Sequence, residues 1–343
     1  MKNLHIPIII CALSFSVSVV SAQSPCANTL YEANKSYEAG DFGRSVSLLN
    51  PCLRYGFSHD EKKEGYRLLA LDYIYLNQSE KADTAVRNML SKDHNYKLFP
   101  NVADPIGLSK IVNTYDVIPL LTVGINLGIN FTNINLVANK APANTTAEYI
   151  PLSGYQFGIE GDFRVWRDVH VTLGVQSYGV RYQHNLDSVA GWSQQFTENL
   201  TYINIPISAR YYIYFKHDAI IRPYIEAGVA VSFLTADNAN LLSTDLSSNN
   251  TSPSSVDPTS RRNNTNTSII FGGGINLKLG GGWLTANVRY LYGQTLIDNP
   301  NNRYNDLDFI FGQQYVDDDF KFNNWQFTIG YALPILYKVE KLK

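Results

Sequence analysis

Beyond its first 20 residues the sequence has no apolar run long enough for a membrane-spanning helix, which needs about 20 consecutive apolar residues. Membrane helices are therefore excluded there. A β-barrel remains open, because barrel strands show alternation rather than a solid apolar block. An excess of one charge is also lacking, since 28 Lys and Arg residues balance 30 Asp and Glu residues. The net charge of −2 offers no basic surface, so no nucleic-acid partner is predicted.

The common catalytic motifs are missing as well. The chain contains no HExxH, GxSxG or Walker loop. After residue 22 its histidines stand singly, at positions 59, 94, 170, 184 and 217. Glu160 and Asp162 suggest paired carboxylates, but Arg164 follows at the same spacing and favours ion pairing instead. We therefore predict no catalytic residue, no cofactor and no metal site.

Cysteine is scarce, with three in the sequence, Cys11, Cys26 and Cys52. Cys11 lies in an N-terminal segment with Lys2, an apolar run over residues 6–20 and small residues at 21 and 22. This layout is typical of a secretory signal peptide, expected at residues 1–22, and the run is short for the alternative, a membrane anchor. In an exported chain the remaining even pair favours a disulfide over a metal site.

From residue 24 to about residue 96 the sequence follows a helical period, and residues 23–112 are predicted to form a separate domain of helix pairs. In an antiparallel pair the start of the first helix lies beside the end of the second. Cys26 and Cys52 occupy these two ends, so a bridge is expected, with two unpaired buried thiols as the alternative. The second pair carries Leu69, Ala70, Tyr73, Ala82 and Val86. This spacing resembles the tetratricopeptide repeat, which implies a protein-binding surface.

From residue 117 the period changes from 3.6 to 2. In the stretch TYINIPISARYYIYF, residues 201–215, apolar side chains occupy every second position and Arg210 stands on the opposite face. Eight such alternating runs follow one another up to residue 337. Alternation alone indicates half-buried strands, and a soluble β-sandwich shows the same pattern.

The connections between the runs favour a barrel over a sandwich. Tight turns at residues 166–168, 216–218 and 280–282 alternate with long polar segments such as 235–267 and 297–320. Short turns at one end and long external loops at the other are typical of outer-membrane barrels. The predicted fold class is therefore α+β multidomain: an N-terminal α-helical domain followed by an eight-stranded antiparallel transmembrane β-barrel over residues 117–337. The helical domain and a C-terminal tail, 338–343, would both be periplasmic.

The charged residues of the strands fall on the polar face, which a barrel turns inward. Eight strands leave an interior that side chains fill, so these residues are predicted to form a buried ion-pair network rather than a conduction path. The predicted members are Glu160, Asp162, Arg164, Arg210, Glu226, Lys278 and Arg289.

Two further expectations concern strand details. Pro206 removes a ladder hydrogen bond in a barrel that has no edge, so a bulge or register break is expected there. Aromatic residues near the outer strand ends, including Tyr182, Tyr202, Tyr292 and Trp325, are expected to form an interfacial belt. The alternative is the ordinary preference of aromatic residues for strands.

Three segments carry a family resemblance: Gly124–Gly128, Tyr202–Ile207 and Tyr224–Gly228. Together with the architecture of residues 117–337, they resemble the PorT-like outer-membrane β-barrel proteins. The resemblance implies a location in the cell outer membrane, contact with outer-membrane lipid, and a role in the envelope, in some members in protein secretion. It also implies that Pro206 is a family feature.

Two classes of function follow. The first is a non-enzymatic barrel that anchors a periplasmic helical domain for a periplasmic or outer-membrane protein partner, in an envelope or secretion-related assembly. The alternative is a small-solute porin or transporter, against which eight strands argue. A third option, a lipid-modifying barrel enzyme, would need a Ser/His pair at the outer rim, where His184 is the nearest histidine. The partner's identity and the oligomeric state stay open.

Overall fold

The computed structural model describes residues 26, 28–94, 96, 106–140, 145–188, 191–213, 219–245, 250–305, 307, 310–311 and 315–342. The signal peptide expected at residues 1–22 lies outside these ranges. Internal contacts divide the chain into two compact units, Met1–Val117 with Val339–Lys343, and Ile118–Lys338. No described helix is both long enough and apolar enough to cross a membrane.

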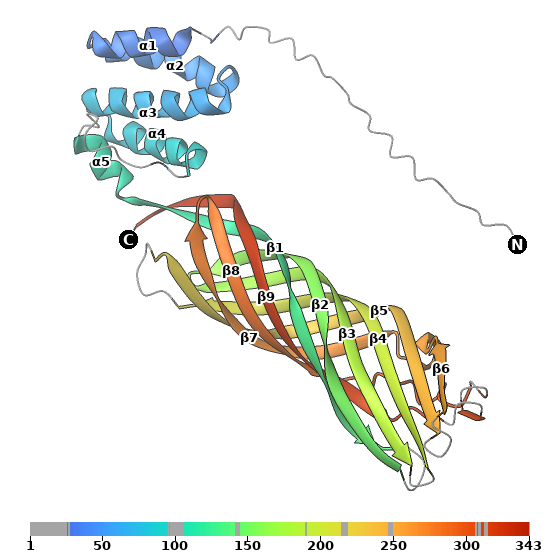
Figure 1. Ribbon diagram of the computed structural model, residues 1–343. Helices are drawn as coiled ribbons and strands as arrows, with labels where there is room; N and C mark the ends of the chain where they lie inside the picture. The colour runs from blue at the N-terminus through green and yellow to red at the C-terminus, as the bar shows by residue number, and fades with distance from the viewer. Residues whose placement is uncertain are drawn as a thin grey trace, which may run out of the picture. The chain divides into compact units, whose positions relative to one another are not determined.

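The helical unit contains α1 (Thr29–Glu38), α2 (Phe42–Tyr55), α3 (His59–Tyr75), α4 (Ser79–Lys92) and α5 (Ile106–Val112) (Figure 1). The start of α3 is fixed by a capping box, in which Ser58 and Glu61 satisfy each other's backbone N–H groups. α1 packs on α2 and α3 on α4, over a core that includes Leu49, Leu68 and Val86. Cys26 and Cys52 form a disulfide with their Cα atoms 5.8 Å apart.

The segment predicted as a C-terminal tail, residues 338–343, begins as a continuation of the last strand. The last strand continues through Lys341, and Val339 packs against the core of the helical unit. The Lys341 ammonium lies 3.1 Å from a carboxylate oxygen of Asp83, and the backbone N–H of Leu342 donates to Thr114 at 2.7 Å. Backbone pairing and this ion pair hold the terminus in place, which a sequence reading of six mostly polar residues did not anticipate.

Asp72 is a buried carboxyl group in the helical unit, and Ser45 Oγ donates to it at 2.7 Å. Burial raises its pKa from 3.8 to about 7. The folded unit keeps this proton between those pH values whereas the unfolded chain releases it, so the free energy of unfolding should fall as the pH rises from about 4 to 7. At 1.36 kcal/mol per pKa unit the loss is at most about 4 kcal/mol.

We expect Asp72→Asn to remove that pH dependence. Urea unfolding of the full chain, followed by the helical circular-dichroism band at about pH 5 and pH 7.5, measures it. The parent protein should unfold at lower urea at the higher pH, and the variant at similar urea at both. If the urea concentration at unfolding fell equally with pH in both proteins, Asp72 would not be the group that causes the pH dependence.

The second unit is a closed sheet. Its strands are β1 (Tyr115–Ala138), β2 (Thr145–Trp166), β3 (Val169–Ser188), β4 (Trp192–Tyr212), β5 (Ile221–Asp245), β6 (Asn250–Val256), β7 (Thr265–Leu279), β8 (Gly282–Gly293) and β9 (Asp319–Lys341). Eight of them form a ring in the order β1-β2-β3-β4-β5-β7-β8-β9, with β9 paired to β1 (Figure 1). The predicted eight-stranded barrel is confirmed, and β6 adds a strand that pairs with the end of β5.

The predicted long external loops are largely wrong, because most of these polar segments are strand. β3 reaches Ser188 and β4 begins at Trp192, while β5 runs to Asp245 and β6 follows. The 20 residues of β3 span roughly 66 Å at about 3.3 Å each, whereas a membrane strand needs about 9–11 residues. The barrel wall therefore continues well past the thickness of a bilayer.

Along β3 and β4 the apolar face changes sides. On β3, Val169, Val171, Leu173 and Val175 are exposed on the outer face, whereas Tyr178, Val180, Tyr182 and Leu186 are buried on the inner face. On β4 the outer face carries isoleucines at 203, 205 and 207 in the part nearer the chain's exit from the strand, whereas Phe196, Leu200 and Tyr202, earlier in the strand, are buried on the inner face. We call the first part the membrane section and the part beyond it, 178–188 of β3 and 192–202 of β4, the distal section.

Pro206 does not cause the predicted bulge. β4 keeps one register with β5 from Tyr202 to Tyr212, and its register with β3 is the same on either side of Pro206. The pairs Gly174–Pro206 and Val175–Ile205 drop out of the β3–β4 ladder, and a Cβ at Gly174 would lie 3.2 Å from the proline Cγ. The pyrrolidine ring of Pro206 thus packs over a glycine. The flanking residue pairs hold the strand register although proline has no backbone N–H to donate.

Candidate functional site

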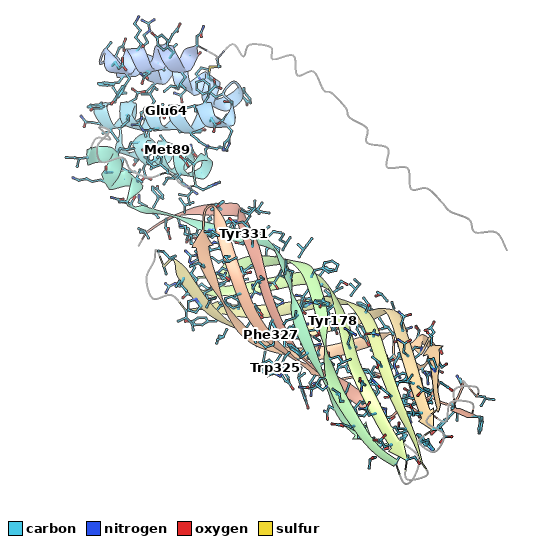
Figure 2. The ribbon with its side chains drawn as sticks, viewed as in Figure 1. Glu64, Met89, Tyr178, Trp325, Phe327 and Tyr331 are labelled. Atoms are coloured by element: carbon cyan, nitrogen blue, oxygen red, sulfur yellow. A yellow bond between two sulfur atoms is a disulfide. The ribbon has the colours of Figure 1, made fainter. Side chains whose placement is uncertain are left out.

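The outer face of the membrane section is apolar. Side chains that are at least a third exposed there include Ile125, Leu127, Phe157, Ile159, Leu173, Val175, Ile207, Val229, Phe271, Val288, Phe327 and Ile329. Phe327 and Trp325, labelled in Figure 2, belong to this surface. A contiguous apolar belt around a closed ring is costly in water, and it is the surface that contacts lipid in a membrane barrel.

The inner face of the membrane section holds a cluster of buried charges, the inner ion cluster. Glu226 accepts from Arg210 Nε at 2.8 Å and from Arg289 Nε at 2.5 Å. Glu160 bridges the same two arginines, with Arg289 Nη2 at 2.5 Å, and Asp162 lies 3.4 Å from Arg210 Nη1. Each of the five side chains is at most 11% exposed, so the charges satisfy one another rather than water.

The structure brings five of the seven predicted lumen residues into this cluster and leaves two outside it. Lys278 has the predicted face but lies two residues before the turn at the end of β7, where its side chain is exposed. Arg164, near the end of β2, is half-buried, and among the described residues no ion pair joins it. Both residues lie near strand ends, where water reaches their charged groups. The predicted network therefore included two residues too many.

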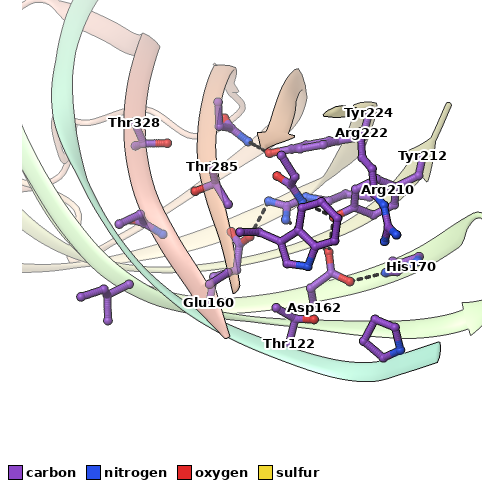
Figure 3. A pocket seen from close by; sticks show the side chains of 18 of the residues that line it. Thr122, Glu160, Asp162, His170, Arg210, Tyr212, Arg222, Tyr224, Thr285 and Thr328 are labelled. Carbon is purple, nitrogen blue, oxygen red and sulfur yellow. Dashed lines mark hydrogen bonds and ion pairs between the residues drawn. The ribbon is translucent and has the colours of Figure 1, made fainter. Parts of the chain in front are cut away.

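The cluster also contains residues that the charge pattern missed. His170 Nδ1 contacts Asp162, as Figure 3 shows, and Tyr212 Oη donates to the same carboxylate at 2.8 Å. Asn287 Nδ2 donates to Glu226 at 2.9 Å. All three lie on the inward face at alternate positions, so the period-2 pattern contained the signal, but their uncharged residue types drew no attention.

From the inner ion cluster toward the distal section, the barrel interior is filled by successive layers of side chains. Buried amides come first, among them Gln156, Gln176, Asn204, Asn324 and Gln326. An aromatic layer follows in the distal section, in which Tyr178, Tyr182, Tyr202, Phe320 and Phe322 pack together. Tyr182 and Tyr202 are 1% and 0% exposed, so their predicted place in an interfacial belt is wrong.

A second group of buried charges, the distal ion cluster, lies against the aromatic layer, where Glu198 is the cross-strand partner of Tyr182. Arg262 donates to Glu198 at 2.7 and 2.8 Å and to Asp317 at 3.0 Å, while Arg261 Nη1 lies 3.0 Å from Asp317. The two arginines come from the connection between β6 and β7, and Asp317 from the one between β8 and β9. These connections fold into the distal section, whereas the sequence analysis placed them in exposed loops.

The described residues contain no group of three or more His, Cys, Asp or Glu side chains arranged to hold a metal ion. The inner ion cluster borders a cavity of about 60 Å³ inside the membrane section, shown in Figure 3. His170, Arg222, Asn276, Trp283 and Asn287 line it. His184 does not lie at an open rim: it is 1% exposed, stacks on Tyr149 and contacts Tyr315 Oη at 2.8 Å.

A closed ring of eight strands, apolar outside and charged inside, defines the class of transmembrane β-barrels. The family model described as outer membrane protein beta-barrel domain matches residues 119–299, more than half of the chain. The protein therefore belongs to this outer-membrane family. No curated protein matches the chain.

Several solved outer-membrane barrels are similar in fold. They include OprG from Pseudomonas aeruginosa, with 14% identity, 65% of this chain and 97% of that chain covered, and a TM-score of 0.37. Neisserial surface protein A has 12% identity, 63% and 97% coverage, and a TM-score of 0.33. Outer membrane protein W of E. coli has 10% identity, 64% and 98% coverage, and a TM-score of 0.32. Likeness at this level supports no inference about function.

Proposed function

We propose that the protein is a non-enzymatic outer-membrane anchor whose helical domain binds a protein partner in the periplasm. The observation that carries the proposal is the filled interior: two ion clusters, an amide layer and an aromatic layer follow one another along the barrel. A barrel plugged in this way suits anchoring better than transport, because solutes need a continuous aqueous path.

The helical domain is proposed to be tetratricopeptide-like and to provide the binding surface. Its paired helices bury small side chains, Ala70 and Ala82, at 0% exposure, as close helix packing in such repeats requires. Large aromatic side chains remain outside this core, with Tyr31 at 74% and Tyr55 at 94% exposure. Exposed aromatic residues are common anchors of protein interfaces. The PorT-like resemblance extends the proposal to an envelope or secretion-related assembly.

The anchoring role predicts an electrically silent barrel. Purified full-length protein in planar lipid bilayers should produce no conductance above the lipid background at either polarity. A small-solute porin would instead give stable, ohmic channels. If such channels appeared in proportion to the protein added, the anchoring hypothesis would be rejected in favour of the small-solute porin.

The partner is tested with a photo-crosslinking amino acid placed in the full chain in cells. Incorporation at Tyr31 or Tyr55 should yield an adduct of one defined mass. The matched control is Arg181, which is exposed on the outer face of the distal section and should not yield that adduct. Absence of any adduct from both helical positions, at normal protein levels, would count against the docking role.

A further inference from the structure

A groove crosses the outer surface of the membrane section, and we call it the outer groove. Its volume is about 760 Å³, within the roughly 300–1,000 Å³ that is typical of ligand pockets. Its lining comes from five neighbouring strands of the ring, β7, β8, β9, β1 and β2. Several side chains of the apolar belt line it, among them Leu127, Val288, Phe327 and Ile329. The outer groove is therefore continuous with the surface that contacts lipid.

Two small residues on neighbouring strands account for this groove. Gly273 on β7 and Ala286 on β8 occupy outward-facing positions, where the membrane section of β3 carries valine and leucine. Gly273 pairs with Val288 and Ala286 pairs with Ile275, so the two small residues are diagonal neighbours. A Cβ at Gly273 would lie 2.9 Å from the carbonyl oxygen of Tyr224, which leaves no room for a larger residue. The backbone itself thus fixes the depression.

Larger apolar side chains flank the depression. Val288 pairs with Phe327 and Ala286 with Ile329, and on the other side of β9 the lining continues through Leu127 and Ile129 of β1. A hydrocarbon chain lying in the groove would contact side chains beneath it and beside it, whereas a chain on a convex wall contacts only what lies beneath. Such dispersion contacts are individually small and collectively large. The groove therefore favours one held chain over the lipids that pass along the rest of the belt.

Aromatic side chains with polar tips lie at the distal side of the groove. Trp325 pairs with Tyr290, and their ring centres are 4.7 Å apart. Each lies two positions nearer the distal section than the groove residue on its own strand, Phe327 or Val288; Figure 2 labels Trp325 and Phe327. Tryptophan and tyrosine concentrate where hydrocarbon meets water. The groove thus lies directly on the hydrocarbon side of that interface.

We propose that the outer groove binds one acyl chain of a membrane lipid whose headgroup lies beside Trp325 and Tyr290. The groove is continuous with the lipid-contacting belt, so bilayer lipid is the molecule that reaches it. A chain of methylene groups matches the apolar lining, because it brings no polar group that would be buried without a partner. This binding goes beyond the anchoring role and depends neither on conduction nor on the helical domain.

The proposal is tested by photolabelling the full-length protein in detergent micelles. The protein is titrated with a phosphatidylethanolamine that carries a diazirine in one acyl chain, and mass spectrometry locates the adducts after irradiation. Adducts on the groove strands β8 and β9 should saturate at one lipid per protein. Adducts at Leu173 and Val175, which face outward on β3, should increase in proportion to the probe. Proportional labelling of both walls, or no labelling at the groove, would overturn the proposal.

Two matched variants locate the chain. Ala286→Phe places a ring in the groove and should abolish the saturable labelling. Ala227→Phe makes the same change at an exposed, outward-facing position of β5 outside the groove, and should label like the parent protein. The compact band on unheated gels shows that both variants fold, and the titration of the parent protein is decisive without them. Saturable labelling that persists in folded Ala286→Phe would place the lipid elsewhere and overturn the proposal.

A second copy of the chain is the other occupant that the experiment can reveal. Native mass spectrometry of the same micelles should show a monomer that carries one lipid, and Ala286→Phe should lose that lipid. A lipid-free dimer that Ala286→Phe dissociates would overturn the proposal, because the groove would then be an interface between two barrels.

Discussion

Replacing Glu226 by glutamine should destabilise the barrel by roughly 3–5 kcal/mol, the usual cost of breaking a buried ion pair from one side. The Glu226 side chain is fully buried and accepts from Arg210, Arg289 and Asn287. Glutamine keeps the size but removes the negative charge, so two buried guanidinium groups would share Glu160 and Asp162 alone. Both guanidinium groups are almost fully buried, so water solvates their excess positive charge poorly.

Urea unfolding in detergent micelles, read as the loss of the compact band on unheated gels, measures this effect. The matched control is Lys278→Gln, which removes a charge from the same inward-facing pattern at an exposed position. Surface changes of that kind usually stay within about 0.5 kcal/mol. If both variants unfold at the same urea concentration as the parent, the inner ion cluster does not stabilise the barrel.

Replacing Arg262 by methionine should have an effect of similar size, confined to the distal section. The Arg262 side chain is 0% exposed and holds Glu198 and Asp317, with Asp237 3.8 Å away. Its loss removes the cation that Glu198 and Asp237 face, while Asp317 keeps Arg261, again at a cost of roughly 3–5 kcal/mol. The membrane section should survive, because its charges are balanced separately.

Limited proteolysis of the protein in liposomes separates the two sections. Arg262→Met should be cut rapidly in the connection between β6 and β7, residues 257–264, and after β8, in residues 294–305, while the compact band on unheated gels persists. Arg181→Met changes an arginine on the outer face of the same section and should resist cleavage like the parent protein. Simultaneous loss of the compact band in Arg262→Met would mean that the two sections fold as one.

The ring itself was predictable, because strand alternation and the even strand count are local properties of the sequence. Arg210, Glu226 and Arg289 were placed inward by their parity alone, that is, by which of the two alternating sets of strand positions they occupy. This assignment holds as long as the strand has no bulge that shifts the alternation. Lys278 and Arg164 show the limit of that reasoning. Parity assigns a face, but the exposure of a side chain also depends on its height along the barrel axis.

The distal section was missed for a different reason. Alternation in QSYGVRYQHNLDS is as regular as in VHVTLGV, but Tyr178 and Tyr182 have the phase opposite to Val171 and Leu173. The reversal marks the point where the solvent outside changes from hydrocarbon to water. Polar composition suggested loops instead, and Arg261 and Arg262 found their partners only through connections far apart in sequence.

The account depends on this reversal along one continuous strand. Ile207 and Thr197 both face outward on β4, ten positions apart and on the same side of the wall. A hydrocarbon environment suits the first and an aqueous one the second. Cys26 and Cys52 are joined in a disulfide, so in protein prepared without residues 1–22, which contain Cys11, one introduced cysteine provides a single labelling position.

Nitroxide labels on Ile207→Cys and Thr197→Cys, in protein reconstituted into lipid bilayers, test the reversal most directly. Electron paramagnetic resonance then compares collisions with oxygen, which concentrates in hydrocarbon, and with a water-soluble nickel chelate. Position 207 should respond to oxygen and be shielded from the chelate, and position 197 should do the opposite. A label at 207 that the chelate reaches as readily as the one at 197 would contradict the account.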